Sequence, residues 1–382
     1  MRCRLTRLLP SAFCLLPSAF CLLAAGCFHK GASQPVMIGH VAPLSGPDKA
    51  IGEHAVHGIQ LAVEEANTDG GLIDGRRVAV EHADSHGDRS AVAAMAVRLI
   101  RLNRVAAVLL GTDADQVADL GSVGREYEIP VLVPEGPPDR PAGDWVFYTG
   151  VPPAERGKAL ARFAAGKPLK AARVFVLIAV GPDRGPVGAA VAAAFIKEFR
   201  KKGGTILRQG TYKDAAGLKE AVKQLGTAPA DAVFLAGAAT DLAQLRDAKL
   251  DARLPVILGA EEASVEGDQA GPPGPTVYAA TAFAVDAGTR QSKQFTRKYQ
   301  DRFGDAPDVH AVVAHDEARL LFEAIRQAKS IEGAKVREAL AGLTDFEGLT
   351  GPVSFKDHWA SRTVFIIRLK KGRMETVAHY RP

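Results

Sequence analysis

Cysteine is confined to the first 27 of the 382 residues, and the remainder of the chain has none. A body built from residues 28–382 therefore contains no disulfide and depends on its apolar core. Aromatic residues are sparse at 6%, although apolar residues of all kinds make up 47%. After residue 26 no apolar run approaches the ~20 residues of a membrane-spanning helix. These absences exclude a disulfide-stapled domain and a protein with several membrane spans.

A large excess of one charge is missing as well. The chain has 48 Lys and Arg residues against 43 Asp and Glu residues. Removing residues 1–26 takes away three arginines and no acid, which leaves a net charge of +2. Nucleic-acid binding requires a strongly basic face, so this balance does not favour it. The length and composition indicate a globular body of roughly two domains.

The first 26 residues differ from the rest. Three arginines precede an apolar run over residues 8–26, and the run ends in Ala24-Ala25-Gly26-Cys27. This order is typical of a secretory signal, and the small residues before a cysteine resemble a bacterial lipobox. We therefore predict a lipoprotein signal peptide over 1–26, lipid attachment at Cys27 and a linker over 27–35. The chain would then be exported and held in the periplasm or cell envelope by its anchor. The alternative is an ordinary signal peptide with a bystander cysteine.

Strand-like apolar runs alternate with helical patterns through the rest of the chain. The segment 52–67, for example, repeats apolar residues every three or four positions. The alternation occurs twice, with a break near residue 150, which predicts two doubly wound α/β lobes with parallel sheets. Ligands of such sheets bind beyond the carboxyl ends of the strands. In the helix predicted over 309–329, His315, Asp316 and Glu317 are expected on the solvated side.

Three segments carry a family resemblance: IGHVAPLSGP at 38–47, GIQLAVEEANTDGGLIDG at 58–75 and FEGLTGPVSF at 346–355. They resemble the branched-chain amino-acid (leucine/isoleucine/valine) binding proteins of ABC transporters, and the likeness extends over residues 36–372. It implies a type I periplasmic binding protein fold, in which a hinge of three crossovers joins the lobes.

The resemblance also implies where the chain passes between the lobes. The crossings are expected near 149–152, 275–280 and 350–354. Lobe 1 would then contain 36–149 plus 280–350, and lobe 2 would contain 150–279 plus 351–382.

The resemblance further implies a ligand site between the lobes. An amino acid needs an acid for its ammonium group and donors for its carboxylate. Glu261 stands where the family's ammonium-binding acid follows a strand of the second lobe. In the family, hydrogen-bond donors for the ligand carboxylate occupy the positions of Asp115 and Glu135. Acids at these positions would repel a carboxylate, whereas Arg184 suits an anion. The ligand, an amino acid or a related small polar molecule, is therefore left open. The remaining expected contacts are Thr112, Gly136, Ala238 and Ile51.

The resemblance implies a monomeric solute-binding protein that delivers its ligand to an ABC transporter permease. The alternative is an extracytoplasmic ligand sensor for a separate signalling partner. An enzyme is not expected, because no G-x-S-x-G elbow and no cysteine nucleophile occur in residues 28–382. No cofactor is expected either. His54 with His57, or His82 with Asp84 and His86, have the residue types of a metal site, but exposed polar faces are favoured, so no metal is predicted.

Overall fold

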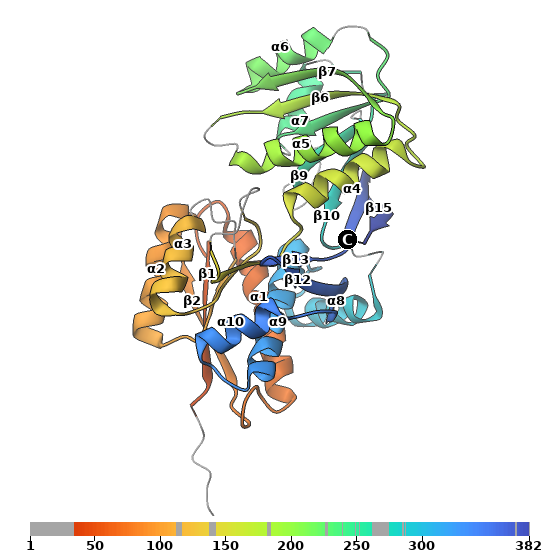
Figure 1. The fold of residues 1–382 in the computed structure, drawn as a ribbon. Helices are drawn as coiled ribbons and strands as arrows, with labels where there is room; N and C mark the ends of the chain where they lie inside the picture. Colours follow the sequence, from red (N-terminus) through yellow and green to blue (C-terminus); the bar gives the residue numbers. More distant parts are fainter. Residues whose placement is uncertain are drawn as a thin grey trace, which may run out of the picture. The chain divides into compact units, whose positions relative to one another are not determined.

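Two mixed sheets organise the chain, and each contains a parallel core with an antiparallel edge (Figure 1). In the computed structural model the order of the first sheet is β11-β12-β13-β5-β4-β3-β1-β2. Its strands are β1 (Val36–Ala42), β2 (Val78–Asp84), β3 (Val108–Leu110), β4 (Val131–Val133), β5 (Val146–Tyr148), β11 (Phe346–Gly348), β12 (Gly351–Lys356) and β13 (Trp359–Ser361). Pairing is parallel from β2 to β13 and antiparallel where β11 and β12 extend the sheet.

The order of the second sheet is β15-β14-β10-β9-β8-β6-β7. Its strands are β6 (Arg173–Ala179), β7 (Thr205–Tyr212), β8 (Ala232–Ala236), β9 (Val256–Glu261), β10 (Val277–Thr281), β14 (Val364–Lys370) and β15 (Arg373–Tyr380). The pairs from β7 to β10 are parallel, whereas β14 and β15 add an antiparallel edge. The prediction of two α/β lobes with mostly parallel sheets is confirmed.

The structure describes residues 34–111, 117–136, 143–181, 185–225, 228–238, 240–248, 250–251, 253–261, 275–284, 286, 288–370 and 373–381. The predicted signal peptide and Cys27 lie outside these ranges. Within them, no helix is both long enough and apolar enough to cross a membrane.

Helices cover both faces of each sheet. Around the first sheet they are α1 (Lys49–Thr68), α2 (Val92–Asn103), which follows a 3-10 turn (Arg89–Ala91), α3 (Val117–Tyr127), α8 (Arg290–Phe303), α9 (Val309–Ala328) and α10 (Gly333–Ala341). One face packs on α1, α9 and α10 and the other on α2 and α3. This layering is the reason that β1, β3 and β4 are almost wholly apolar and buried.

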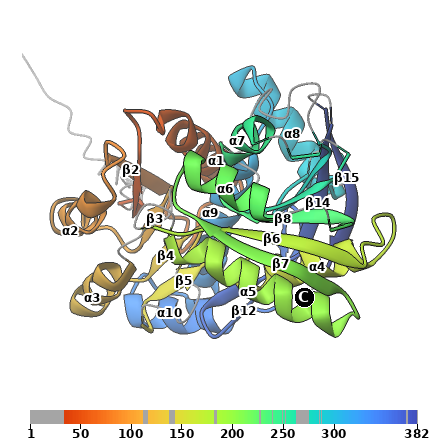
Figure 2. The same ribbon diagram turned by 90° about the horizontal axis from the view of Figure 1, so that it is seen from above.

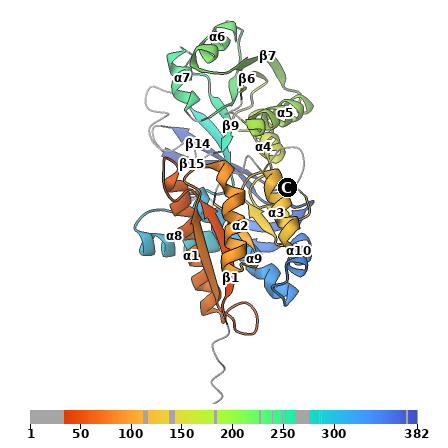
Figure 3. The ribbon, with the colours of Figure 1, turned by 90° about the vertical axis from the view of Figure 1, so that its left-hand side faces the viewer.

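The second sheet has the same layered construction. Its helices are α4 (Pro153–Ala165), α5 (Gly185–Lys201), α6 (Ala215–Leu225) and α7 (Asp241–Asp247). Figures 2 and 3 show α4 and α5 on one side of β6 and β7 and α6 and α7 on the other. The side chains of Phe195 and Phe234 stack at 4.0 Å between α5 and β8, within the larger of the two apolar layers.

The chain passes between the sheets three times. It leaves the first sheet after β5, returns to it between β10 and β11, and leaves again between β13 and β14. The expectation that the last crossing falls near 350–354 is wrong, because β12 and β13 still pair within the first sheet through Trp359 and Tyr148. Residues 351–361 therefore belong with the first sheet, and residues 280–281 stay with the second as the end of β10. The turn at Asp357 and His358 joins β12 to β13 as an antiparallel pair, and both residues have a positive φ. No helical period or strand-like alternation in the sequence predicts this turn.

Helix α9 departs from the expected amphipathic pattern. His315, Asp316 and Glu317 are buried, with 1%, 0% and 0% of their surfaces exposed, so the prediction that they face solvent is wrong. The reason is that α1 and α8 pack on one side of α9, while Leu349 and Arg362 contact it on the other. A helix covered on several sides has no polar stripe to reveal its orientation.

Candidate functional site

The candidate ligand residues that the structure describes lie at the carboxyl ends of parallel strands or just after them. Glu135 and Gly136 follow β4, Ala238 follows β8, and Glu261 is the last residue of β9. Ile51 lies in the first turn of α1, the helix that follows β1. No hydrogen bond or ion pair joins two of the described residues Ile51, Glu135, Gly136 and Ala238. Thr112, Asp115 and Arg184 lie outside the described residues.

The loop between β1 and α1 is held by Asp84 at the end of β2. One carboxylate oxygen of Asp84 accepts hydrogen bonds from the backbone amides of Leu44, at 2.9 Å, and His86, at 2.7 Å. The hydroxyl of Ser45 and the Nδ1 of His86 lie 2.8 Å apart. Burial opposes ionisation of Asp84, but these hydrogen bonds hold its pKa below the usual value. Asp84 and His86 therefore shape the loop that leads into α1, the helix whose first turn contains Ile51.

Glu135 forms an ion pair with an arginine that the sequence analysis had not singled out. Its Oε1 lies 2.7 Å from the Nη2 of Arg156 on α4, and the two side chains are only 11% and 3% exposed. The pair links the end of β4 to the first turns of the helix that opens the second lobe. Because Arg156 neutralises Glu135, this acid does not act as a free negative charge against a ligand carboxylate. The expectation that Glu135 repels such a carboxylate is therefore not supported by its surroundings.

Gly136 is a position where the fold tolerates no side chain. A Cβ atom there would come within 2.0 Å of the Tyr148 ring. The ring of Trp359 also stacks on the Tyr148 ring, with 4.2 Å between the ring centroids. Gly136 is thus buried against an aromatic pair that joins β5 to β13. Its role in this structure is close packing, and any ligand contact would be made by its backbone.

The loop after β8 is tied down by Asp241, a fully buried residue at the start of α7. One oxygen of Asp241 accepts from the Tyr212 hydroxyl at 2.6 Å and from the amide of Ala238 at 3.0 Å. The amide of Ala238 is therefore occupied within the protein. The protein thus has a small side chain at Ala238, and the backbone behind it is held by Asp241.

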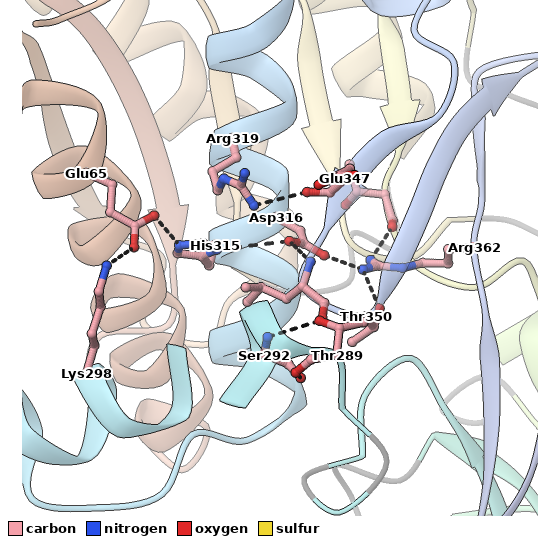
Figure 4. Close-up of polar contacts among 12 residues, drawn as sticks. Glu65, Thr289, Ser292, Lys298, His315, Asp316, Arg319, Glu347, Thr350 and Arg362 are labelled. Carbon is pink, nitrogen blue, oxygen red and sulfur yellow. Dashed lines mark hydrogen bonds and ion pairs between the residues drawn. The ribbon is translucent and has the colours of Figure 1, made fainter. Parts of the chain in front are cut away.

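A buried polar network connects the three crossovers (Figure 4). The guanidinium of Arg362, just after β13, donates to the carboxylate of Asp316 on α9 at 2.7 Å and to the backbone oxygen of Thr149 at 2.9 Å. Asp316 also accepts from the amide of Leu349 at 2.9 Å. Thr289, the N-cap of α8, donates its hydroxyl to the backbone oxygen of Leu349 at 2.7 Å. Residues from every crossing thus share one set of contacts.

Two charge states in this network are set by their surroundings. Burial opposes ionisation of Asp316, but the imidazole of His315 and the guanidinium of Arg362 hold its pKa below the usual value. For the neighbouring Glu317 burial dominates and raises the pKa well above its usual range, against the weaker effect of Arg362. Neither carboxyl oxygen of Glu317 has a hydrogen-bond partner in the structure. The buried surroundings of Glu317 therefore favour the uncharged form of its carboxyl group.

The network reaches the surface through Glu65 on α1. Its two oxygens lie 3.1 Å from the Nε2 of His315 and 2.8 Å from the Nζ of Lys298 (Figure 4). Burial opposes ionisation of Glu65, but hydrogen bonds and charge from His315 and Lys298 lower its pKa to about 2. This chain of contacts connects α1, α8 and α9 to the hinge.

The histidines considered as metal ligands have protein partners. His54 pairs with Asp308 at 3.1 Å, and His57 lies 3.2 Å from the hydroxyl of Tyr299. His82 and the buried His40 share a contact of 2.8 Å between their Nδ1 atoms. Among the described residues, no group of three or more His, Cys, Asp or Glu side chains is arranged to hold a metal ion.

Sequence reasoning missed Arg156, Asp316 and Arg362. A signal existed for Arg156, because it falls on the apolar stripe of α4 with Pro153 and Leu160, at positions that a helix buries. An arginine on a buried stripe requires a buried partner. No comparable local signal existed for Asp316 or Arg362, which are 46 residues apart in the sequence.

The sequence pattern described as "Periplasmic binding protein" matches residues 35–373 of this chain. The chain belongs to the periplasmic binding protein family. Among curated proteins, this binding protein is 25% identical to Leu/Ile/Val-binding protein homolog 7 of Brucella suis biovar 1 (strain 1330), and the match covers 84% of each chain.

Solved structures of the family share the fold of this binding protein. The branched-chain amino-acid substrate-binding protein LivJ of Streptococcus pneumoniae, solved with isoleucine, has 21% identity and a TM-score of 0.75, covering 91% of this chain and 100% of its own. A solute-binding protein of an ABC transporter from Rhodopseudomonas palustris BisB5, solved with 3,4-dihydroxybenzoic acid, has 19% identity and a TM-score of 0.74, covering 91% and 97%. At these identities the likeness concerns the fold.

Proposed function

We propose that this protein captures an amino acid or a related small polar solute between its two lobes and delivers it to an ABC transporter permease. The family match over residues 35–373 carries the proposal. The arrangement of the candidate residues supports it, since those that are described stand at or just after strand ends or in the first turn of α1. The hinge network supports closure as the capture mechanism, because one set of contacts joins every crossing and lets the lobes move as bodies about it.

The surroundings of the candidates favour a ligand with an ammonium group. Glu135 is paired with Arg156 and so does not repel a ligand carboxylate, while Glu261 ends β9 at the position where the resemblance expects the acid that binds an ammonium group. An ammonium group bound to Glu261 would gain a charge-assisted hydrogen bond. The relatives solved with isoleucine and with 3,4-dihydroxybenzoic acid differ in this respect, because only the first ligand carries an ammonium group. We therefore propose an amino acid over an aromatic acid.

A thermal-shift titration tests the ligand class. Leucine, isoleucine and 3,4-dihydroxybenzoate are each added to the chain from residue 28 onward, and the melting temperature is recorded. A ligand that binds only the folded protein raises the melting temperature in proportion to the logarithm of its concentration above Kd. A rise with the amino acids that is lost in Glu261→Ala supports the proposal. A rise with the aromatic acid alone would contradict it.

Replacing Glu261 with alanine should weaken binding of the amino acid identified in this way by at least tenfold, which corresponds to about 1.4 kcal/mol. The reason is the loss of the charge-assisted contact to the ammonium group. Isothermal titration of both proteins measures the change. The adjacent Glu262→Ala variant is the matched control and should bind as the parent does. An unchanged dissociation constant for Glu261→Ala would remove this residue from the site.

We also propose that the chain is a lipoprotein attached to the membrane through Cys27. The small residues before Cys27 support cleavage at that point, and the short segment 27–35 then links the anchor to β1. In cells expressing the full chain, Cys27→Ser should move the protein from the membrane fraction to the soluble fraction. Cys21→Ser, within the segment to be removed, should leave it with the membrane. Membrane attachment of the Cys27→Ser protein would refute this anchor.

A further inference from the structure

A cavity lies beside the hinge, and none of its lining residues is a candidate ligand residue. Its volume is about 470 Å³, within the size range of small-molecule sites. It is lined by the start of α4, by the segment from Lys356 to Val364, and by Tyr380 and Arg381 at the end of β15. None of the described candidate residues lines it. It therefore needs an explanation other than the capture of a solute between the lobes.

The first turn of α4 contributes unpaired amide groups to this cavity. Helix α4 has 13 residues and begins at Pro153, and no side chain caps its N-terminus in the structure. Proline has no amide hydrogen, so the first free amides of the turn belong to Ala154 and Glu155, both of which line the cavity. Uncapped amides at a helix N-terminus attract anions.

A buried cation independently indicates the same class of ligand. Arg362 lines the cavity with 1% of its side chain exposed, and its Nε has no hydrogen-bond partner in the structure. Its two terminal nitrogens are engaged with Asp316 and Thr149, so the Nε edge is the part left to donate. A buried N–H without an acceptor is costly, and an anion in the cavity would satisfy it.

The charges around the cavity add to this preference. Lys356 and Arg381 form no ion pair with any residue that the structure describes. Glu155 is paired with Lys158 at 2.6 Å, which leaves Asp357 as the acid that opposes an anion. The half-buried ring of Trp359 forms part of the lining and offers a flat apolar surface.

We propose that this cavity is a second binding site, which takes a small organic anion with a planar ring. The anionic group is held by the first-turn amides of α4, by the Nε of Arg362 and by Lys356, and the ring lies against Trp359. The site stands apart from the proposed transport function, because it shares no residue with the candidate ligand positions.

Phenyl phosphate tests this site because it combines a ring with an anionic group. The chain contains two tryptophans, Trp145 and Trp359, so a Trp145→Phe variant reports from Trp359 alone. Titration with phenyl phosphate should quench its fluorescence with saturation, whereas phenol and inorganic phosphate should bind at least tenfold more weakly. Isothermal titration of the protein with both tryptophans should give the same Kd, which removes any dependence on the Trp145→Phe variant.

Charge variants in the cavity give opposite expected results. Lys356→Glu should weaken phenyl phosphate binding at least tenfold. Asp357→Asn should strengthen it severalfold and preserve the left-handed backbone at that position, because asparagine tolerates this conformation. Lys219→Glu, on the exposed face of α6, is the matched control and should change nothing. The proposal is overturned if phenyl phosphate does not bind, if Lys356→Glu binds it unchanged, or if Glu261→Ala abolishes its binding.

Discussion

Replacing Arg362 with methionine should lower the free energy of unfolding by about 3–5 kcal/mol, because it leaves the carboxylate of Asp316 buried without a counter-charge. The wild-type pair is wholly inside the protein, with 1% and 0% of the two side chains exposed. The substitution also removes the donor to the backbone oxygen of Thr149. Urea unfolding followed by circular dichroism measures the change.

Arg368→Met is the matched control for this experiment. Arg368 lies on β14, six residues after Arg362, and pairs with Glu375 on the neighbouring strand. Because that pair is half exposed, its loss should cost less than about 1 kcal/mol. Equal costs for the two variants would show that the buried pair has no special role in stability.

A double variant separates the charge from the packing. In Asp316→Leu/Arg362→Met both members of the pair become apolar, so no uncompensated charge remains. We expect the double variant to be more stable than Arg362→Met alone. If it is less stable by the sum of the two single effects, then the cost arises from the other hydrogen bonds of the hinge, and the charge argument fails.

Replacing Glu317 with glutamine should stabilise the protein, and the gain should grow as the pH rises. Burial raises the pKa of Glu317 well above its usual value, so the folded protein keeps this proton whereas the unfolded chain releases it above about pH 4.5. The contribution of Glu317 to the free energy of unfolding is therefore fully present below that pH. Above it, this contribution falls by about 1.4 kcal/mol per pH unit until the pH reaches the pKa of the folded state. Glutamine has no proton to release and avoids this loss.

Unfolding free energies of the wild type and Glu317→Gln at pH 4.5, 6 and 7.5 measure the effect. The two proteins should be alike at pH 4.5, and the advantage of Glu317→Gln should grow towards pH 7.5, by at most about 1.4 kcal/mol per pH unit. Glu323→Gln, on a half-exposed part of the same helix, should show no pH-dependent gain. A Glu317→Gln protein that is less stable than the wild type at pH 7.5 would contradict the assignment of a neutral carboxyl group.

The candidate site divides into parts that the sequence could and could not predict. The family resemblance placed Glu261 and Ala238 at strand ends of the second lobe, and they do lie at the end of β9 and just after β8, whereas their contact with a ligand stays a prediction. The pairing of Glu135 was not predictable, since Arg156 lies 21 residues away and only folding brings it within 2.7 Å. A pattern of residue types along a chain identifies loops but not the charges that face them.

The sequence by itself determined the α/β alternation and the double winding, because each strand or helix records its own burial in a local period. The family followed from the resemblance of three segments, at 38–47, 58–75 and 346–355. Only the tertiary structure decided that residues 351–361 complete the first sheet and that His315, Asp316 and Glu317 lie inside the molecule. These outcomes depend on contacts between segments far apart in the chain. Such contacts decide which faces of an element are covered, and local periodicity has no information about them.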